Sequence, residues 1–291
     1  MLQLHGIIPA LITPYHEDES LDAVGLSALV RHLLPDVDGL LVNGTTADFP
    51  LLTHAERQEA IAAVVEVVAG QKPVLAGTGA IATREAIALT REARDAGADA
   101  ALVIAPYYLR PSLTGLERHF AAIAAALPDF PILLYNFPQL AGQPIPPDMV
   151  VRLAAIPNIV GMKDTSGDLA YMLEVLERVP PDFQVLVGRG TVFLPAIAAG
   201  AVGGILACAN LIPAQWQAVY RAILDGDWEA ARAGQYRAQR VSRITGMGGS
   251  LAVRAGLEMR GLHVGPPRQP LAFEGAVREA DLALLCEALG V

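Results

Sequence analysis

The chain has 291 residues, of which 53% are hydrophobic and 18% charged, so it can bury a large core and is not a disordered protein. Its formal net charge of −9 argues against nucleic acid or an anionic membrane as the main partner. The two cysteines, Cys208 and Cys286, match no zinc or disulfide framework, and no signal peptide or long apolar span is visible, so we expect a cytoplasmic protein.

Eight short apolar runs predict β-strands along the first two thirds of the chain. Their apolar character is nearly continuous, as in parallel strands that are covered on both faces. The predicted strands are residues 6–13, 39–43, 73–77, 100–106, 131–136, 159–163, 184–188 and 203–207.

Helical segments with recognisable ends lie between these runs. The spacing predicts capping boxes at 53–56 and 114–117, each with Thr at the N-cap and Glu three residues later. Asp168 is predicted to cap a helix, Gly97 to end one, and Pro213 to be the first residue of another.

Eight strand–helix units in succession favour a (β/α)8 TIM barrel over a doubly wound sheet. We assign the barrel and its active site to residues 1–224, which include the eighth barrel helix. Residues 225–291 show a helical pattern and are predicted to add roughly three helices at one end of the barrel. In such barrels the active site lies at the carboxyl ends of the strands.

Lys163 stands at the end of the sixth predicted strand in a chain that otherwise relies on arginine. Of its 21 Lys and Arg residues, two are lysines, Lys72 and Lys163, which leaves 19 arginines. Arg stays protonated in proteins, whereas burial lowers the pKa of a lysine and lets it attack a ketone. The alternative is that Lys163 extends to water. Lys72 falls on the opposite side of the barrel and is expected to be solvated.

Other polar residues follow neighbouring strands. Tyr135 ends the fifth strand and could carry protons for imine chemistry, or be a core tyrosine with its hydroxyl at the rim. Gly44, Thr45 and Thr46 form either a plain loop or an anion cradle of backbone N–H groups and hydroxyls. Tyr108 follows another tyrosine and could serve packing or an interface.

Together these segments resemble the dihydrodipicolinate synthase / N-acetylneuraminate lyase family. The resemblance covers nearly the whole chain and is strongest over residues 7–210. The segments that carry it are PALITPY (9–15), GTT (44–46), LTHAER (52–57), PYYLRPS (106–112), YNFP (135–138) and GMKDTSGD (161–168). It implies a class I aldolase that forms a Schiff base between a lysine and the keto group of pyruvate or a related 2-oxo acid.

The resemblance also assigns catalytic roles. Lys163 matches the Schiff-base lysine, and Tyr135 matches the tyrosine that shuttles protons. Thr45 matches the hydroxyl of the proton relay, and Tyr108 matches a tyrosine that the family lends across a dimer interface. The resemblance therefore implies a homotetramer built from two tight dimers.

The substrate-binding positions carry over in the same way. Thr46, with Gly44 and the neighbouring backbone N–H groups, matches the carboxylate binder, and Gly188 and Ile205 match positions near the bound 2-oxo acid. No metal or organic cofactor is expected, because the imine is itself the electron sink and the six histidines show no metal-ligand spacing.

Four positions bear on the second substrate. The synthase branch usually carries an Arg at the position of Leu140 to hold the carboxylate of aspartate semialdehyde, so Leu140 predicts the lyase and sugar-acid aldolase branch. Thr165 suits a hydroxylated substrate. Arg189 could bind an acidic aldehyde such as glyoxylate, or lie on the rim. Asp48 either replaces the family's glutamate or caps a turn.

We therefore expect cleavage or formation of a 4-hydroxy-2-oxo acid from pyruvate and an aldehyde. A 2-keto-3-deoxy sugar acid and a 4-hydroxy-2-oxoglutarate type of substrate both fit. One alternative is a dihydrodipicolinate synthase or a sugar-acid dehydratase that uses the same imine. The other is a non-catalytic sensor that binds pyruvate.

Overall fold

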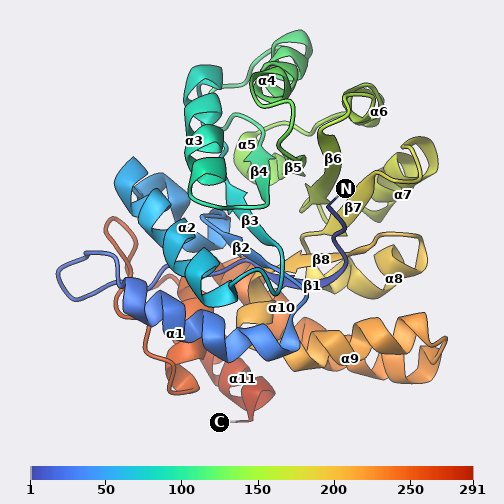
Figure 1. The fold of residues 1–291 in the computed structure, drawn as a ribbon. Coiled ribbons are helices and arrows are strands. Elements are labelled where there is room, and N and C mark those ends of the chain that lie inside the picture. Colours follow the sequence, from blue (N-terminus) through green and yellow to red (C-terminus); the bar gives the residue numbers. More distant parts are fainter. Residues whose placement is uncertain (1, 291) are drawn as a thin grey trace.

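The computed structural model describes residues 2–290, which contain eight parallel strands arranged as a barrel (Figure 1). The strands are β1 (Gly6–Pro9), β2 (Leu40–Val42), β3 (Val74–Gly77), β4 (Ala100–Ile104), β5 (Ile132–Asn136), β6 (Ile159–Asp164), β7 (Gln184–Val187) and β8 (Gly203–Leu206). Neighbours in sequence pair in parallel from β2 to β8, and β8 pairs with β1. A bridge between Ala10 and Leu41 completes the circle. The predicted TIM barrel is confirmed.

Helices alternate with the strands and form an outer ring around the barrel (Figure 1). They are α1 (Ala23–Leu33), α2 (His54–Val68), α3 (Thr83–Asp95), α4 (Leu113–Ala126), α6 (Pro147–Ala154), α7 (Leu169–Arg178), α8 (Phe193–Ala198) and α9 (Pro213–Leu224). The short α5 (Pro138–Ala141) comes between β5 and α6. After α9 come α10 (Trp228–Met259) and α11 (Glu279–Leu289). Among residues 2–290, no helix combines the length and the apolar character needed to cross a membrane.

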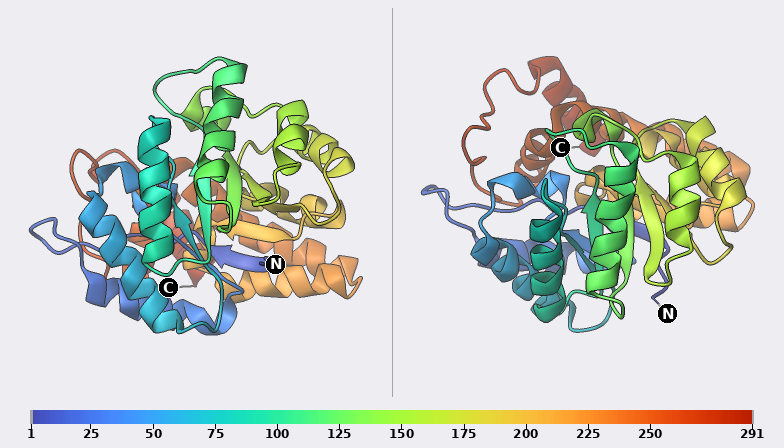
Figure 2. Two further views of the ribbon diagram at one scale, coloured as in Figure 1. Left: turned by 45° about the horizontal axis from the view of Figure 1, so that its top comes forward. Right: turned by 90° about the horizontal axis from the view of Figure 1, so that it is seen from above.

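The C-terminal helices lie at one end of the barrel, and the segment that leads into β1 lies near the other (Figure 2, right). Helix α10 contacts three short 3-10 helices that follow strands: Thr45–Ala47 after β2, Gly190–Val192 after β7 and Ala207–Asn210 after β8. These contacts place α10 over the carboxyl ends of the strands. The helical character predicted for the tail is confirmed, whereas the boundary at residue 224 stays a prediction.

Apolar side chains fill two separate layers. Between the strands and the outer helices lies the larger core, as expected when both faces of each strand are covered. Inside the barrel a smaller cluster contains Ile8, Leu41, Leu75, Leu102, Leu133, Tyr135, Leu186 and Ile205. Successive residues of a strand point to opposite faces, whereas residues paired across neighbouring strands point to the same face. The residues paired with this cluster therefore also point inward.

Most of the predicted helix ends are present. Thr53 and Glu56 form the predicted capping box, a kind of cap whose loss costs about 1 kcal/mol. Asp168 accepts a hydrogen bond from the N–H of Tyr171, and Pro213 begins α9. The box predicted at 114–117 was wrong, because Ser112 takes the N-cap of α4, where its hydroxyl accepts from the N–H of Gly115.

Candidate active site

Lys163 points into the barrel from the end of β6. Its ladder partners are Tyr135 on β5 and Leu186 on β7, and both of those side chains belong to the interior cluster. The lysine is only 4% exposed, and its Nζ lies 4.4 Å from the centroid of the Tyr135 ring. Lys163 therefore does not extend to bulk water, which was the alternative.

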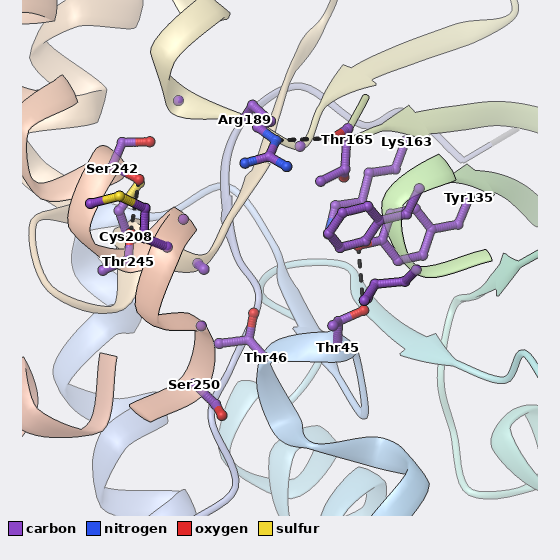
Figure 3. Close-up of a pocket in the computed structure, with 18 residues that line it drawn as sticks. Thr45, Thr46, Tyr135, Lys163, Thr165, Arg189, Cys208, Ser242, Thr245 and Ser250 are labelled. Atoms are coloured by element: carbon purple, nitrogen blue, oxygen red, sulfur yellow. Dashed lines mark hydrogen bonds between the residues drawn. The ribbon is translucent and has the colours of Figure 1, made fainter. Parts of the chain in front are cut away.

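Tyr135 connects this lysine to the loop after β2. Its hydroxyl lies 3.4 Å from Oγ1 of Thr45, and either oxygen can donate the hydrogen bond (Figure 3). Tyr135 is 3% exposed, so the hydroxyl is held in a site where the barrel excludes most solvent. Lys163, Tyr135 and Thr45 thus form a continuous row from an amine through a phenol to a hydroxyl.

These residues open into a cavity of about 260 Å³, which we call the main cavity (Figure 3). Seven of the ten predicted site residues line it: Thr45, Thr46, Tyr135, Lys163, Thr165, Gly188 and Arg189. Thr45 and Thr46 begin a 3-10 helix, and the first N–H groups of a helix lack partners within it. A carboxylate in the main cavity could therefore be bound by backbone N–H groups as well as by hydroxyls.

The other three predicted residues lie outside the main cavity. Tyr108 is 89% exposed, with a φ of 71°, and borders a separate apolar hollow of about 530 Å³. Gly44 precedes the 3-10 helix, where a Cβ would lie 2.9 Å from Cδ2 of Leu41. Ile205 pairs with Ile8, and its side chain is buried in the barrel interior.

A buried hydrogen-bond network fixes the strand ends beside Lys163. Asn136 Nδ2 donates to Asp164 Oδ1 at 2.6 Å, and the Ser166 hydroxyl donates to Asp164 Oδ2 at 2.7 Å. The N–H of Ile145 donates to Asn136 Oδ1. Burial raises the pKa of Asp164, and the bonds from Ser166 and Asn136 act in the opposite direction. The network holds the ends of β5 and β6 together and so orients Tyr135 and Lys163.

Asp48 borders the apolar hollow beside Tyr108. It adopts a left-handed conformation with a φ of 53°, and its side chain is buried. Burial raises the pKa of Asp48, opposed by a hydrogen bond from Ser250 and the charge of Arg254. The carboxylate thus contacts α10 and does not line the main cavity, which favours a structural role.

Sequence reasoning missed the wall that α10 supplies. Ser242, Thr245, Met247 and Ser250 line the main cavity from this helix, together with Cys208, Phe137 and Leu140 from the barrel. The helix breaks at Gly249, which has a φ of 58° and a ψ of −141°. The sequence GMGGS at 246–250 was the available signal, because three glycines within a helical pattern indicate an interruption.

The sequence as a whole matches one known family. Residues 3–282 fit the dihydrodipicolinate synthetase family. The chain belongs to this family. The family prediction is therefore confirmed, and the protein is an enzyme of the class I aldolase type, a carbon–carbon lyase.

Named relatives and solved structures of the family are similar over nearly their full length. The chain is 41% identical to 4-hydroxy-tetrahydrodipicolinate synthase of Methanoculleus marisnigri, over 91% of this chain and 92% of the relative. It is 40% identical to the enzyme of that name from Methanosphaerula palustris, over 95% and 96%. The crystal structure of dihydrodipicolinate synthase from Bacillus anthracis matches with a TM-score of 0.95 and 35% identity, over 100% of this chain and 99% of the other. These names support the synthase alternative rather than the predicted lyase branch.

Proposed function

We propose that the protein binds pyruvate as an imine on Lys163 and uses the derived enamine to form, or in reverse to cleave, a carbon–carbon bond with an aldehyde. The observation that carries this proposal is the row of Lys163, Tyr135 and Thr45 inside the main cavity. A buried amine beside a phenol and a hydroxyl suits imine chemistry, which needs a nucleophile and a nearby proton carrier.

Each step can be assigned to a side chain. Nζ of Lys163 attacks the keto carbon of pyruvate, and the carbonyl oxygen leaves as water after protonation through Tyr135. Tyr135 then removes a proton from C3 to give the enamine. The enamine carbon attacks the aldehyde carbon. Tyr135 returns the proton to the aldehyde oxygen, which becomes a hydroxyl. Water releases the product from Lys163. The imine accepts the electron pair in the reverse direction, so the sequence of steps needs no metal or organic cofactor.

Two observations bear on the aldehyde, and they point in different directions. The names of the relatives favour synthesis from aspartate semialdehyde. Leu140 favours a different aldehyde, because the synthase branch usually has an arginine at this position, whereas here an apolar side chain lines the main cavity. A retro-aldol activity on a 4-hydroxy-2-oxo acid therefore remains the second candidate.

The proposal includes a second copy of the chain at Tyr108. This tyrosine is exposed, and so are two apolar side chains close to it in sequence, Leu109 (60%) and Leu113 (52%). Exposed apolar side chains of this kind are suited to burial between subunits. We propose that Tyr108 completes the proton relay of a neighbouring subunit, in a homotetramer located in the cytoplasm. Analytical ultracentrifugation of the wild type and of Tyr108→Ser tests the assembly.

Borohydride reduction in the presence of pyruvate tests the imine. Intact and peptide mass spectrometry should show one pyruvate-derived adduct per chain, located on Lys163. Lys72→Ala is the matched control and should retain the adduct, while Lys163→Ala should lose it. No adduct in the wild type, or an adduct on Lys72, contradicts the proposal. An adduct without turnover on any aldehyde would favour the pyruvate-binding sensor.

A further inference from the structure

Arg189 gives the main cavity a second cation. It stands two residues after β7 and is half-buried. Its guanidinium lies opposite Thr46, between the α10 side chains and the Lys163–Tyr135 pair (Figure 3). Among the described residues that line the main cavity, Lys163 and Arg189 are the charged ones, and no carboxylate is present. In a chain of net charge −9 this local excess of positive charge favours an anionic occupant.

The guanidinium is fixed in place but not neutralised. Its Nε donates to the backbone oxygen of Thr165 at 3.1 Å, and its Cζ lies 5.8 Å from the centroid of the Phe137 ring. Within residues 2–290, its two terminal Nη groups make no ion pair or hydrogen bond. A carboxylate could therefore be bound by both Nη groups, which is the strongest form of such a contact.

A buried hydroxyl beside this arginine also lacks a partner. Thr165 is 6% exposed and lines the main cavity, and its Oγ1 has no hydrogen bond within the described part of the chain. An unpaired buried hydroxyl is costly unless a ligand completes it. Gly188 makes room for it, because a Cβ there would lie 1.8 Å from Oγ1 of Thr165.

The loop that carries Arg189 is anchored to α10. Gln235 Nε2 donates to the backbone oxygen of Gly190 at 2.8 Å, and Gln235 Oε1 accepts from the N–H of Leu194. A Cβ on Gly190 would come within 2.7 Å of Oγ of Ser242, so glycine allows the close approach of loop and helix. Arg189 is thereby a positioned group of the cavity wall and not a free side chain on its rim.

We infer that Arg189, together with the hydroxyl of Thr165, binds the carboxylate of the aldehyde substrate, so that the enzyme selects anionic aldehydes. This inference rests on the proposed function. It assigns to the residues after β7 the anion-binding role for which Leu140, in α5, has no suitable group. The substrate class is an aldehyde that bears a carboxylate, and the product with pyruvate is a 4-hydroxy-2-oxo dicarboxylic acid or its cyclised form.

Two aldehydes that differ in the carboxylate provide the test. Glyoxylate and pyruvate give 4-hydroxy-2-oxoglutarate, whereas acetaldehyde and pyruvate give 4-hydroxy-2-oxopentanoate; in each case the C3 of pyruvate bonds to the aldehyde carbon. The quantity to follow is the ratio of kcat/KM for glyoxylate to kcat/KM for acetaldehyde. In Arg189→Gln the ratio should fall about 10- to 100-fold, mainly through KM for glyoxylate, because the charge-assisted bonds are lost. The ratio for Arg189→Lys should lie between the ratios for Arg189→Gln and the wild type.

Arg243→Gln is the matched control. Arg243 is an exposed arginine of α10 that lies outside the main cavity, so its loss should leave the ratio unchanged. An Arg189→Gln ratio equal to that of the wild type overturns the inference, as does a wild type that accepts acetaldehyde but neither glyoxylate, succinate semialdehyde nor aspartate semialdehyde. The imine is read separately: a Lys163 adduct that persists in Arg189→Gln shows that the proposed function stands, whereas a missing wild-type adduct contradicts that function itself.

Discussion

The two walls of the main cavity differ in how they are built. The strand wall, Lys163 and Tyr135 on β6 and β5, is nearly inaccessible, and a parallel ladder fixes it residue by residue. The helix wall, Arg189 after β7 and Ser242 to Ser250 on α10, depends on a short 3-10 helix and on a helix broken at Gly249.

We infer from this difference that the two walls have different roles. In the proposed function, the ladder holds the reacting groups in one geometry, which suits steps that any 2-oxo acid would undergo. The helix wall can change its side chains without disturbing the ladder, which suits the choice of aldehyde. Variants on the strand wall should therefore affect every substrate, and variants on the helix wall should affect substrates selectively.

The largest effect is expected for Lys163→Arg. Arginine keeps a positive charge beside the Tyr135 ring but cannot act as a neutral amine, so turnover of every aldehyde and the borohydride adduct should both fall below detection. A melting temperature close to that of the wild type would show that the fold persists. Measurable turnover of any aldehyde would contradict the prediction that the strand wall acts on every substrate.

Tyr135→Phe should come next. The variant keeps the ring that Lys163 contacts but loses the hydroxyl that reaches Thr45, so kcat should fall about 10²- to 10⁴-fold. The fall should be equal for glyoxylate and acetaldehyde. Steady-state kinetics with both aldehydes check this, and a selective loss on one of them would place Tyr135 in substrate choice instead.

Gly188→Ala tests the place where the two walls meet. Its new Cβ would collide with Oγ1 of Thr165 at 1.8 Å and approach the backbone oxygen of Asp164 at 2.9 Å. We expect a loss of about 1–3 kcal/mol in the free energy of unfolding, as for other overpacked sites, together with weaker binding of glyoxylate. Urea unfolding measures the first effect; an unchanged free energy would mean that Thr165 moves freely.

A pH effect on stability should be separable from both walls. Burial lowers the pKa of His119 on α4 to about 4, so the unfolded chain binds the proton more readily between pH 6.5 and pH 4. The contribution of neutral His119 to the free energy of unfolding is therefore fully present above pH 6.5. It is lost as the pH falls towards 4, by roughly 3 kcal/mol in all. His119→Gln should flatten this part of the curve of unfolding free energy against pH. An equally steep curve in the variant would exclude His119 as the cause.

The strand wall and Arg189 were predictable from sequence, whereas the α10 part of the helix wall was not. Apolar runs located the strands, and the carboxyl ends of barrel strands face the active site, so Lys163 and Tyr135 were candidates by position. Their catalytic roles were predicted from the family resemblance. The α10 residues come from the tail, 79 or more positions after Lys163, and no local pattern shows which turn of a helix covers the barrel. The proposed role of Tyr108 could not be predicted from one chain either, because it depends on contacts with a neighbouring subunit.

One weak place in the barrel lies away from both walls. Other neighbouring strands share ladders. Within residues 2–290, β1 and β2 share the Ala10–Leu41 bridge and a hydrogen bond from the N–H of Leu11 to the oxygen of Leu41. Asp38, just before β2, also exchanges two hydrogen bonds with the backbone of Ile7. Asn210 reinforces this seam by donating to the oxygen of Ala10 at 2.7 Å. We therefore expect thermal opening of the barrel to begin at this seam, and the Leu11 amide to exchange its hydrogen for deuterium before the amides of β5 and β6 do.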